Sequence, residues 1–206
     1  MSAGSQLLLV EAAALPPVLA SAAPEDFDLP TVCTAWSVRD VLAHCAGALS
    51  NLVQGSSSSY SPEDNQRDVD LRSSWPVDQV IEELLAGYAA AATVIEDAGG
   101  AADGLALGEW IHGGDVREPL RARDAYASAG VELAIPLIRD RSVRRSAPAV
   151  EVLVDGHEVA FGSGAPIGAL VTDAATFVRL VSSRRPDPAR YELQGAVTPQ
   201  HLVLFS

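Results

Sequence analysis

Apolar residues recur at helical spacing through the first hundred or so residues of the chain, in segments separated by polar loops. Apolar positions three or four residues apart are typical of helices that bury one face. The pattern predicts a first helix over residues 6–20, ended by Pro16 and Pro17 or just after them, because an interior proline ends or bends a helix.

The clearest helix begins after Ser37, where Asp40 three residues later completes an approximate capping box. At about 100° per residue, His44 lies about 60° outside the edge of the apolar stripe. A histidine there can turn toward the centre of a bundle, although it can equally be an ordinary surface or buried histidine. The stripe consists of Val38, Val41, Leu42, Cys45, Leu49, Leu52 and Val53.

Two further helices are predicted over residues 78–98 and 102–117, the first ended by Gly99 and Gly100. The segment between the second and third helices, residues 54–72, reads as a mobile loop, because it has little apolar surface to offset the entropy cost of ordering. Four helices with one long connection indicate a four-helix bundle.

Beyond Leu120 the pattern changes. Residues 150–161 alternate apolar and polar side chains around Asp155-Gly156, which predicts a β-hairpin. A helix over residues 172–183 and a strand over 201–205 follow. The sequence therefore predicts an α+β protein, with a helical bundle over residues 1–123 and a small α+β domain over 124–206.

The charge balance narrows the classes of function. The chain has 206 residues, with 14 basic and 27 acidic side chains, so its formal charge is −13. Nucleic acids and anionic membrane surfaces need clustered cations, and we therefore expect neither as a partner.

No stretch approaches the roughly 20 apolar residues of a membrane helix. The start of the chain imitates a signal peptide but lacks a positive n-region, and Glu11 interrupts its apolar run.

The two cysteines, Cys33 and Cys45, lack the paired CxxC spacing of a structural zinc site. We expect reduced thiols in a cytoplasmic protein, present as a monomer or homodimer. Either cysteine could be a nucleophile, but no basic run near it would lower a thiol pKa. We expect His157 to be exposed in the hairpin and His201 to begin the last strand without an acidic neighbour.

Glu109, His112 and Asp115 follow one another at three-residue spacing, which places them on one helix face. A Glu-x-x-His pair on a bundle helix can present a carboxylate and an imidazole to a metal. With His44 as the further ligand, an open position remains for water or substrate, as in catalytic zinc sites. The alternative is a solvated polar face. Gly113-Gly114 weakens the helix and also allows a close approach there.

Three segments resemble a known family. LPTVCTAWSVRDVLAHCAGAL over residues 29–49 resembles the signature that opens the second helix in the mycothiol-dependent maleylpyruvate isomerase family, part of the DinB-like metal-binding bundle superfamily. GEWIHGGDVREPL over residues 108–120 is similar to the fourth-helix motif of that family. FVRLVSSRRPDPARYELQGA over residues 177–196 resembles the small C-terminal domain, related to sterol carrier proteins, of many members.

The resemblance implies a divalent metal, usually zinc, bound by His44, Glu109 and His112, with Asp115 as an alternative ligand. It also implies mycothiol, the small thiol of actinobacteria, as cosubstrate at the open metal position. In the isomerase this thiolate adds to the double bond of maleylpyruvate, and elimination after rotation yields fumarylpyruvate. The family's acid stands four residues before the histidine, where this chain has Gly108.

A small organic acid would need a cationic partner in this acidic protein. Arg117 is the first candidate, followed by Arg184 and Arg185, and each could equally be a surface arginine. The sequence thus favours a mycothiol-dependent isomerase or thiol transferase. Two alternatives stay open: a non-catalytic protein that binds a metal or small ligand, and a hydrolase that activates zinc-bound water.

Overall fold

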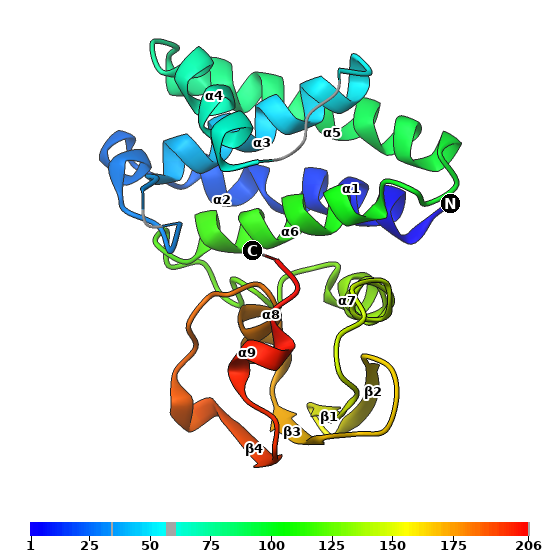
Figure 1. The fold of residues 1–206 in the computed structure, drawn as a ribbon. Coiled ribbons are helices and arrows are strands. Elements are labelled where there is room, and N and C mark those ends of the chain that lie inside the picture. Colours follow the sequence, from blue (N-terminus) through cyan, green and yellow to red (C-terminus); the bar gives the residue numbers. More distant parts are fainter. Residues whose placement is uncertain (34, 57–60, 206) are drawn as a thin grey trace. The chain divides into compact units, whose positions relative to one another are not determined.

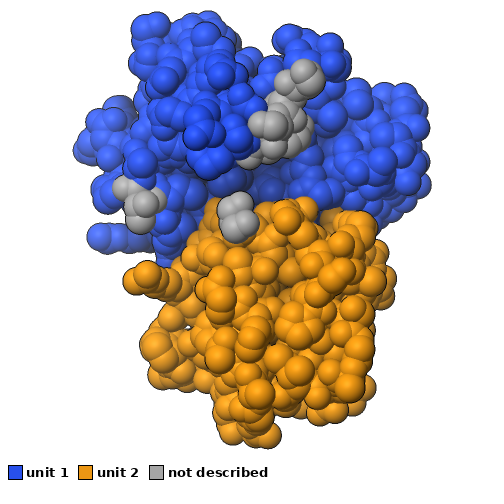
Figure 2. All heavy atoms as spheres, in the orientation of Figure 1, with its two compact units in different colours: residues 1–125 blue, residues 126–206 orange. Residues whose placement is uncertain are grey.

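The computed structural model describes residues 1–33, 35–56 and 61–205. The chain divides into two compact units, residues 1–125 and 126–206 (Figure 2). Part of the predicted loop, residues 57–60, lies outside the described residues.

Unit 1 contains a four-helix bundle, as predicted. Helix α3 packs against α5 and α6, and α1 packs against the same two helices (Figure 1). The shared core includes Leu8, Leu42, Leu84 and Tyr88. The elements are α1 (Ala3–Ala14), α2 (Pro16–Ala20), η1 (Pro24–Asp28), α3 (Val38–Val53), α4 (Pro62–Arg72), α5 (Val77–Asp97) and α6 (Asp103–Arg117).

The helix starts follow local capping. The predicted capping box of α3 is confirmed, since Ser37 accepts from the Asp40 amide and the Asp40 carboxylate accepts from the Ser37 amide at 3.0 Å. The predicted first helix is two helices. The first begins early because Ser2 caps it, and Pro16 opens the short second helix at a position where proline is tolerated.

Helix α4 contradicts the predicted loop over residues 54–72. Ser61 caps it by accepting from the Asp64 amide at 3.2 Å, and Pro62 occupies its first turn. It packs on α3 through a few buried side chains, Asp68, Val69 and Arg72. Two of these three side chains are charged, so the segment shows no apolar stripe, and hydrophobic periodicity did not predict a helix there.

One stretch among the described residues, Ala3–Ala20, is long and apolar enough for a membrane span by length and composition, which corrects the expectation that none would be. Leu7, Leu8 and Glu11 on its first part are fully buried in the bundle. A helix that buries an apolar face, and whose buried acid Glu11 is paired with Arg117, is typical of a protein core.

Unit 2 contains a four-stranded mixed sheet in the order β2-β1-β3-β4. Strand β1 (Val150–Val154) pairs antiparallel with β2 (His157–Phe161) and parallel with β3 (Gly168–Thr172), which pairs antiparallel with β4 (Tyr191–Gly195). The helical elements are α7 (Val131–Arg144), α8 (Ala174–Val181), η2 (Pro188–Arg190) and α9 (Pro199–Leu202). The predicted α+β class is confirmed.

The hairpin prediction is also confirmed, since Asp155 and Gly156 join β1 to β2 with positive φ angles of 50° and 81°. The predicted strand over residues 201–205 is wrong. His201 lies in α9, where Pro199 occupies the first turn, and the chain after the helix is not paired as a strand. Buried Leu202 and Leu204 produced the alternation that suggested a strand.

Candidate functional site

Helices α3 and α6 bring two predicted site residues together. The rings of His44 on α3 and His112 on α6 lie edge to face, with their centroids 5.1 Å apart. His44 is 5% exposed, and the Trp36 ring lies against it at 5.0 Å between centroids. The two histidine side chains therefore lie side by side between α3 and α6, and the ring of His44 is buried there.

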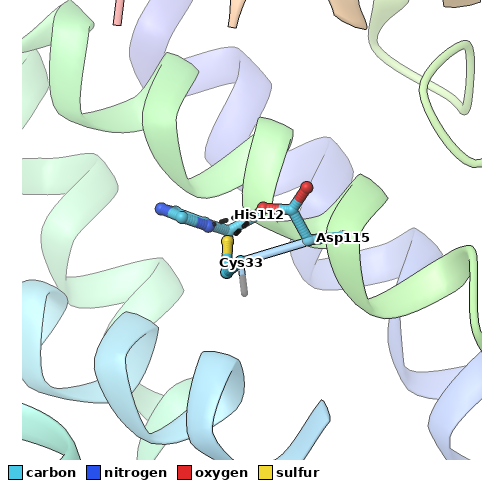
Figure 3. A group of neighbouring side chains, drawn as sticks. All are labelled: Cys33, His112 and Asp115. Carbon is cyan, nitrogen blue, oxygen red and sulfur yellow. Dashed lines mark hydrogen bonds and ion pairs between the residues drawn. The ribbon is translucent and has the colours of Figure 1, made fainter. Parts of the chain in front are cut away.

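Asp115 joins His112 to a residue that the sequence did not place at the site (Figure 3). The His112 Nδ1–H donates to Asp115 Oδ2 at 2.9 Å, and the Cys33 thiol donates to the same oxygen at 3.3 Å. Asp115 is fully buried. Within the described ranges, these three residues form the one group of three or more metal-ligating side chains whose donor atoms lie within 4.8 Å of one another.

Glu109 lies on the same helix but outside this group. It is buried, and its carboxyl is hydrogen-bonded by the Cys45 thiol. Burial raises the pKa of Glu109 to about 8 and raises the pKa of Cys45 well above its ordinary value. Glu109 therefore holds its proton at neutral pH in the metal-free protein, whereas a metal ligand must be ionised.

The raised pKa of Glu109 predicts a pH-dependent stability. The folded protein keeps this proton up to about pH 8, while the unfolded chain loses it above about pH 4.5, so stability is full below pH 4.5 and falls as the pH rises to 8. In metal-free protein we expect a loss of about 1 kcal/mol per pH unit in that window. Glu109→Gln should flatten the profile in urea unfolding, whereas the exposed Glu25→Gln should not. Parallel profiles for Glu109→Gln and wild type would contradict this account.

The sequence missed Asp68, which α4 brings to His44. Its Oδ2 lies 3.7 Å from His44 Nδ1, and Asn51 Nδ2 donates to its other oxygen at 3.1 Å. Gly47 makes the approach possible, because a Cβ there would lie 2.5 Å from the Asp68 carboxyl carbon. The distance is that of an ion pair rather than a hydrogen bond, and a small movement would let this buried carboxylate accept a proton from the ring nitrogen and orient the histidine. Because the sequence predicted a loop over residues 54–72, it gave no reason to expect Asp68 beside His44.

Arg117, the first candidate for substrate binding, lies elsewhere in the interior. It is 2% exposed and forms an ion pair with the fully buried Glu11 of α1, at 2.8 Å between Nη1 and Oε1. A side chain at Gly113 would collide with Glu11, so the predicted close approach at Gly113-Gly114 is confirmed there. Because Glu11 matches its charge, Arg117 offers no solvent-facing cation to an anionic substrate.

The other predicted residues lie in unit 2. Arg184 donates to the Ser182 carbonyl at 2.6 Å, and Arg185 is exposed; their roles in substrate binding stay predictions. His157 is exposed, as expected. His201 caps the start of α9, where its Nδ1 accepts from the Thr198 amide.

The fold and this cluster define a helical-bundle protein with a candidate metal-binding site, followed by a small α+β unit. A sequence model of the mycothiol maleylpyruvate isomerase N-terminal domain matches residues 8–125. The chain therefore belongs to the mycothiol maleylpyruvate isomerase family, which confirms the resemblance found in the sequence.

Two crystal structures share the fold over both units. One is of a mycothiol-dependent maleylpyruvate isomerase, with 15% sequence identity and a TM-score of 0.62. The other is of a histidine-to-alanine mutant of a mycothiol-dependent maleylpyruvate isomerase, with 14% identity and a TM-score of 0.59. Each match covers 95% of this chain and 94% of the other. No curated protein matches the chain.

Proposed function

We propose that this chain is a metal-dependent enzyme that uses a small thiol of the mycothiol type as cosubstrate, and that it acts as an isomerase or thiol transferase on a small organic acid. The observation that carries the proposal is the meeting of His44 and His112 beside the buried carboxylate of Asp115. Membership of the isomerase family supports the class of reaction.

The residues at the site fit a divalent metal such as zinc. Imidazole and carboxylate are ligands that zinc accepts, and His44, His112 and Asp115 offer them from two facing helices. Glu109 is the further candidate from the sequence. Residues 1–125 carry 6 arginines and 19 acidic side chains, so the whole formal charge of −13 belongs to the unit that holds the site. The negative electrostatic potential of this unit favours binding of a cation.

The chain's own residues would prepare the site for chemistry. Without metal, Asp115 holds the His112 ring by accepting its Nδ1–H, and Asp68 stands beside the Nδ1 of His44. Trp36 lies against the His44 ring, which is 5% exposed. A bound zinc ion would lower the pKa of a coordinated thiol, so that the cosubstrate is a thiolate near neutral pH.

Turnover assays can separate the proposed function from its alternatives. Zinc-loaded and chelator-treated protein should be compared with and without mycothiol, on maleylpyruvate for isomerisation and on a small organic acid electrophile for thiol transfer. We expect activity that needs both metal and thiol. Activity with metal alone would indicate the hydrolase. Metal binding without turnover would favour the non-catalytic alternative, which Gly108 supports because the family's acid is missing there.

Asp68 is proposed as the positioning residue of His44. Removing such a partner of a metal ligand costs 10–100-fold in metal affinity. We therefore expect Asp68→Asn to weaken zinc binding by roughly 10–100-fold, measured by competition with a chromophoric chelator. The exposed Asp70→Asn on the same helix is the matched control and should bind zinc like wild type. Equal affinities for the two variants would remove Asp68 from the site.

A further inference from the structure

We infer that Cys33 is itself a ligand of the proposed metal, so that a thiolate, the His112 imidazole and the Asp115 carboxylate together form its donor set. The inference rests on the proposed function, because it concerns the same site. It places a sulfur ligand, which neither the predicted ligand set nor the family comparison assigns, in the position that the proposed function gives to His44.

The donor atoms are spaced as ligands of one ion. His112 Nδ1 and Asp115 Oδ2 are 2.9 Å apart, and Cys33 Sγ lies 3.3 Å from the same oxygen (Figure 3). Around a tetrahedral zinc ion, the N–O and O–S edges are about 3.3 and about 3.5 Å, given the usual bond lengths. The two separations that share Asp115 Oδ2 are therefore within a few tenths of an ångström of the metal-bound values, and all three donor atoms lie within 4.8 Å of one another.

The loop before α3 holds Cys33 in place. The Cys33 amide donates to Thr31 Oγ1 at 3.1 Å, and the Thr31 hydroxyl donates to the Trp36 carbonyl at 2.9 Å. The Trp36 amide donates to the Cys33 carbonyl at 2.7 Å, and Pro30 and Ser37 are bridged. Because these contacts tie the backbone of Cys33 to Thr31 and Trp36, little ordering entropy of Cys33 remains to oppose binding by the thiol.

Charge and local space support this donor set. A thiolate and a carboxylate together match the two positive charges of a zinc ion beside the fully buried Asp115. One turn before His112, Gly108 offers no ligand, and a Cβ there would meet nothing within 4 Å. A sulfur, nitrogen and oxygen set suits zinc or cobalt, whereas magnesium and calcium prefer oxygen ligands alone.

Metal binding at this set requires no oxidant or reductant. The proton that Cys33 now donates to Asp115 leaves for solvent when the sulfur binds the metal. The neutral His112 ring keeps its one proton, which changes from Nδ1 to Nε2 so that Nδ1 can bind the metal. The metal keeps its oxidation state. With three protein ligands, one position stays open, the arrangement that distinguishes catalytic from structural zinc sites.

Cobalt substitution tests the inference through the absorption spectrum. Co²⁺ bound by a thiolate gives a sulfur-to-metal charge-transfer band in the near ultraviolet. We expect this band in wild type, its loss in Cys33→Ser and its retention in Cys45→Ser. Both variants keep one cysteine, so they form a matched pair. We also expect zinc affinity to fall at least about 100-fold in Cys33→Ser, since loss of an outer-shell partner alone costs 10–100-fold.

A second readout uses unaltered protein, in case the serine variant folds poorly. Bound zinc should slow alkylation of the half-buried Cys33, read by peptide mass spectrometry, with the buried Cys45 as internal reference. Metal that binds without the band and without protecting Cys33 would overturn this inference but leave the proposed function standing. A folded protein that binds no transition metal would overturn both.

Discussion

Arg117→Ala is expected to lower the free energy of unfolding by about 3–5 kcal/mol, because it leaves the Glu11 carboxylate buried without its partner. Burial already raises the pKa of Glu11 despite the neighbouring guanidinium, so the carboxylate depends on that charge. Urea unfolding at neutral pH measures the loss, with circular dichroism as the signal.

Two further variants show whether the pair itself is responsible. The double variant Glu11→Gln with Arg117→Met removes both charges at similar volume, and it should be clearly more stable than Arg117→Ala. Arg123 is exposed, and Arg123→Ala should change stability by no more than about 0.5 kcal/mol. If Arg117→Ala were as stable as Arg123→Ala, the pair would contribute nothing to the bundle, and Arg117 would return as a substrate-binding candidate.

His112→Ala is expected to reduce zinc binding at least about 100-fold and to bring thiol-dependent turnover to background, because His112 is common to every donor set considered for this site. It links the ring of His44 to the carboxylate of Asp115. His157→Ala, in an exposed position of β2, is the matched control and should retain both properties. Equal turnover in the two variants would exclude a catalytic metal at the described cluster.

Local signals predicted the elements that depend on local chemistry. The capping box at Ser37 and Asp40 and the turn at Asp155-Gly156 both act within a few residues, and both are confirmed. Helix α4 has a serine N-cap at Ser61, but because it lacks an apolar stripe the sequence predicted a loop there. Strands β3 and β4 depend on pairing across the sheet, which periodicity does not reveal.

The candidate site was only partly visible in the sequence for the same reason. His44 and His112 could be identified from helix position and family motif, and the structure brings them together. Cys33 reaches Asp115 across 82 residues, and Arg117 finds Glu11 across 106. Spacing along one helix cannot show such partners, so the sequence did not place Cys33 beside Asp115, and it offered Arg117 for substrate binding without its partner Glu11.

The structure shows where several acidic side chains of unit 1 lie relative to its arginines and histidines. Arg72 is paired with Glu83 and Arg117 with Glu11, so two arginines of the bundle are already matched by acids. The carboxylates of Asp68 and Asp115 lie beside the histidines. Unit 1 is therefore suited to a cation first, and the roles of Arg184 and Arg185 in substrate binding stay predictions.

The metal content of the purified full chain tests the central claim most directly. Atomic emission analysis of folded protein, after dialysis against zinc and removal of loosely bound ions, should find about one zinc per chain, as expected for a single site with two histidines and a carboxylate available. The same treatment should leave His112→Ala without zinc. A folded wild-type protein that retains no zinc or other transition metal would contradict the account.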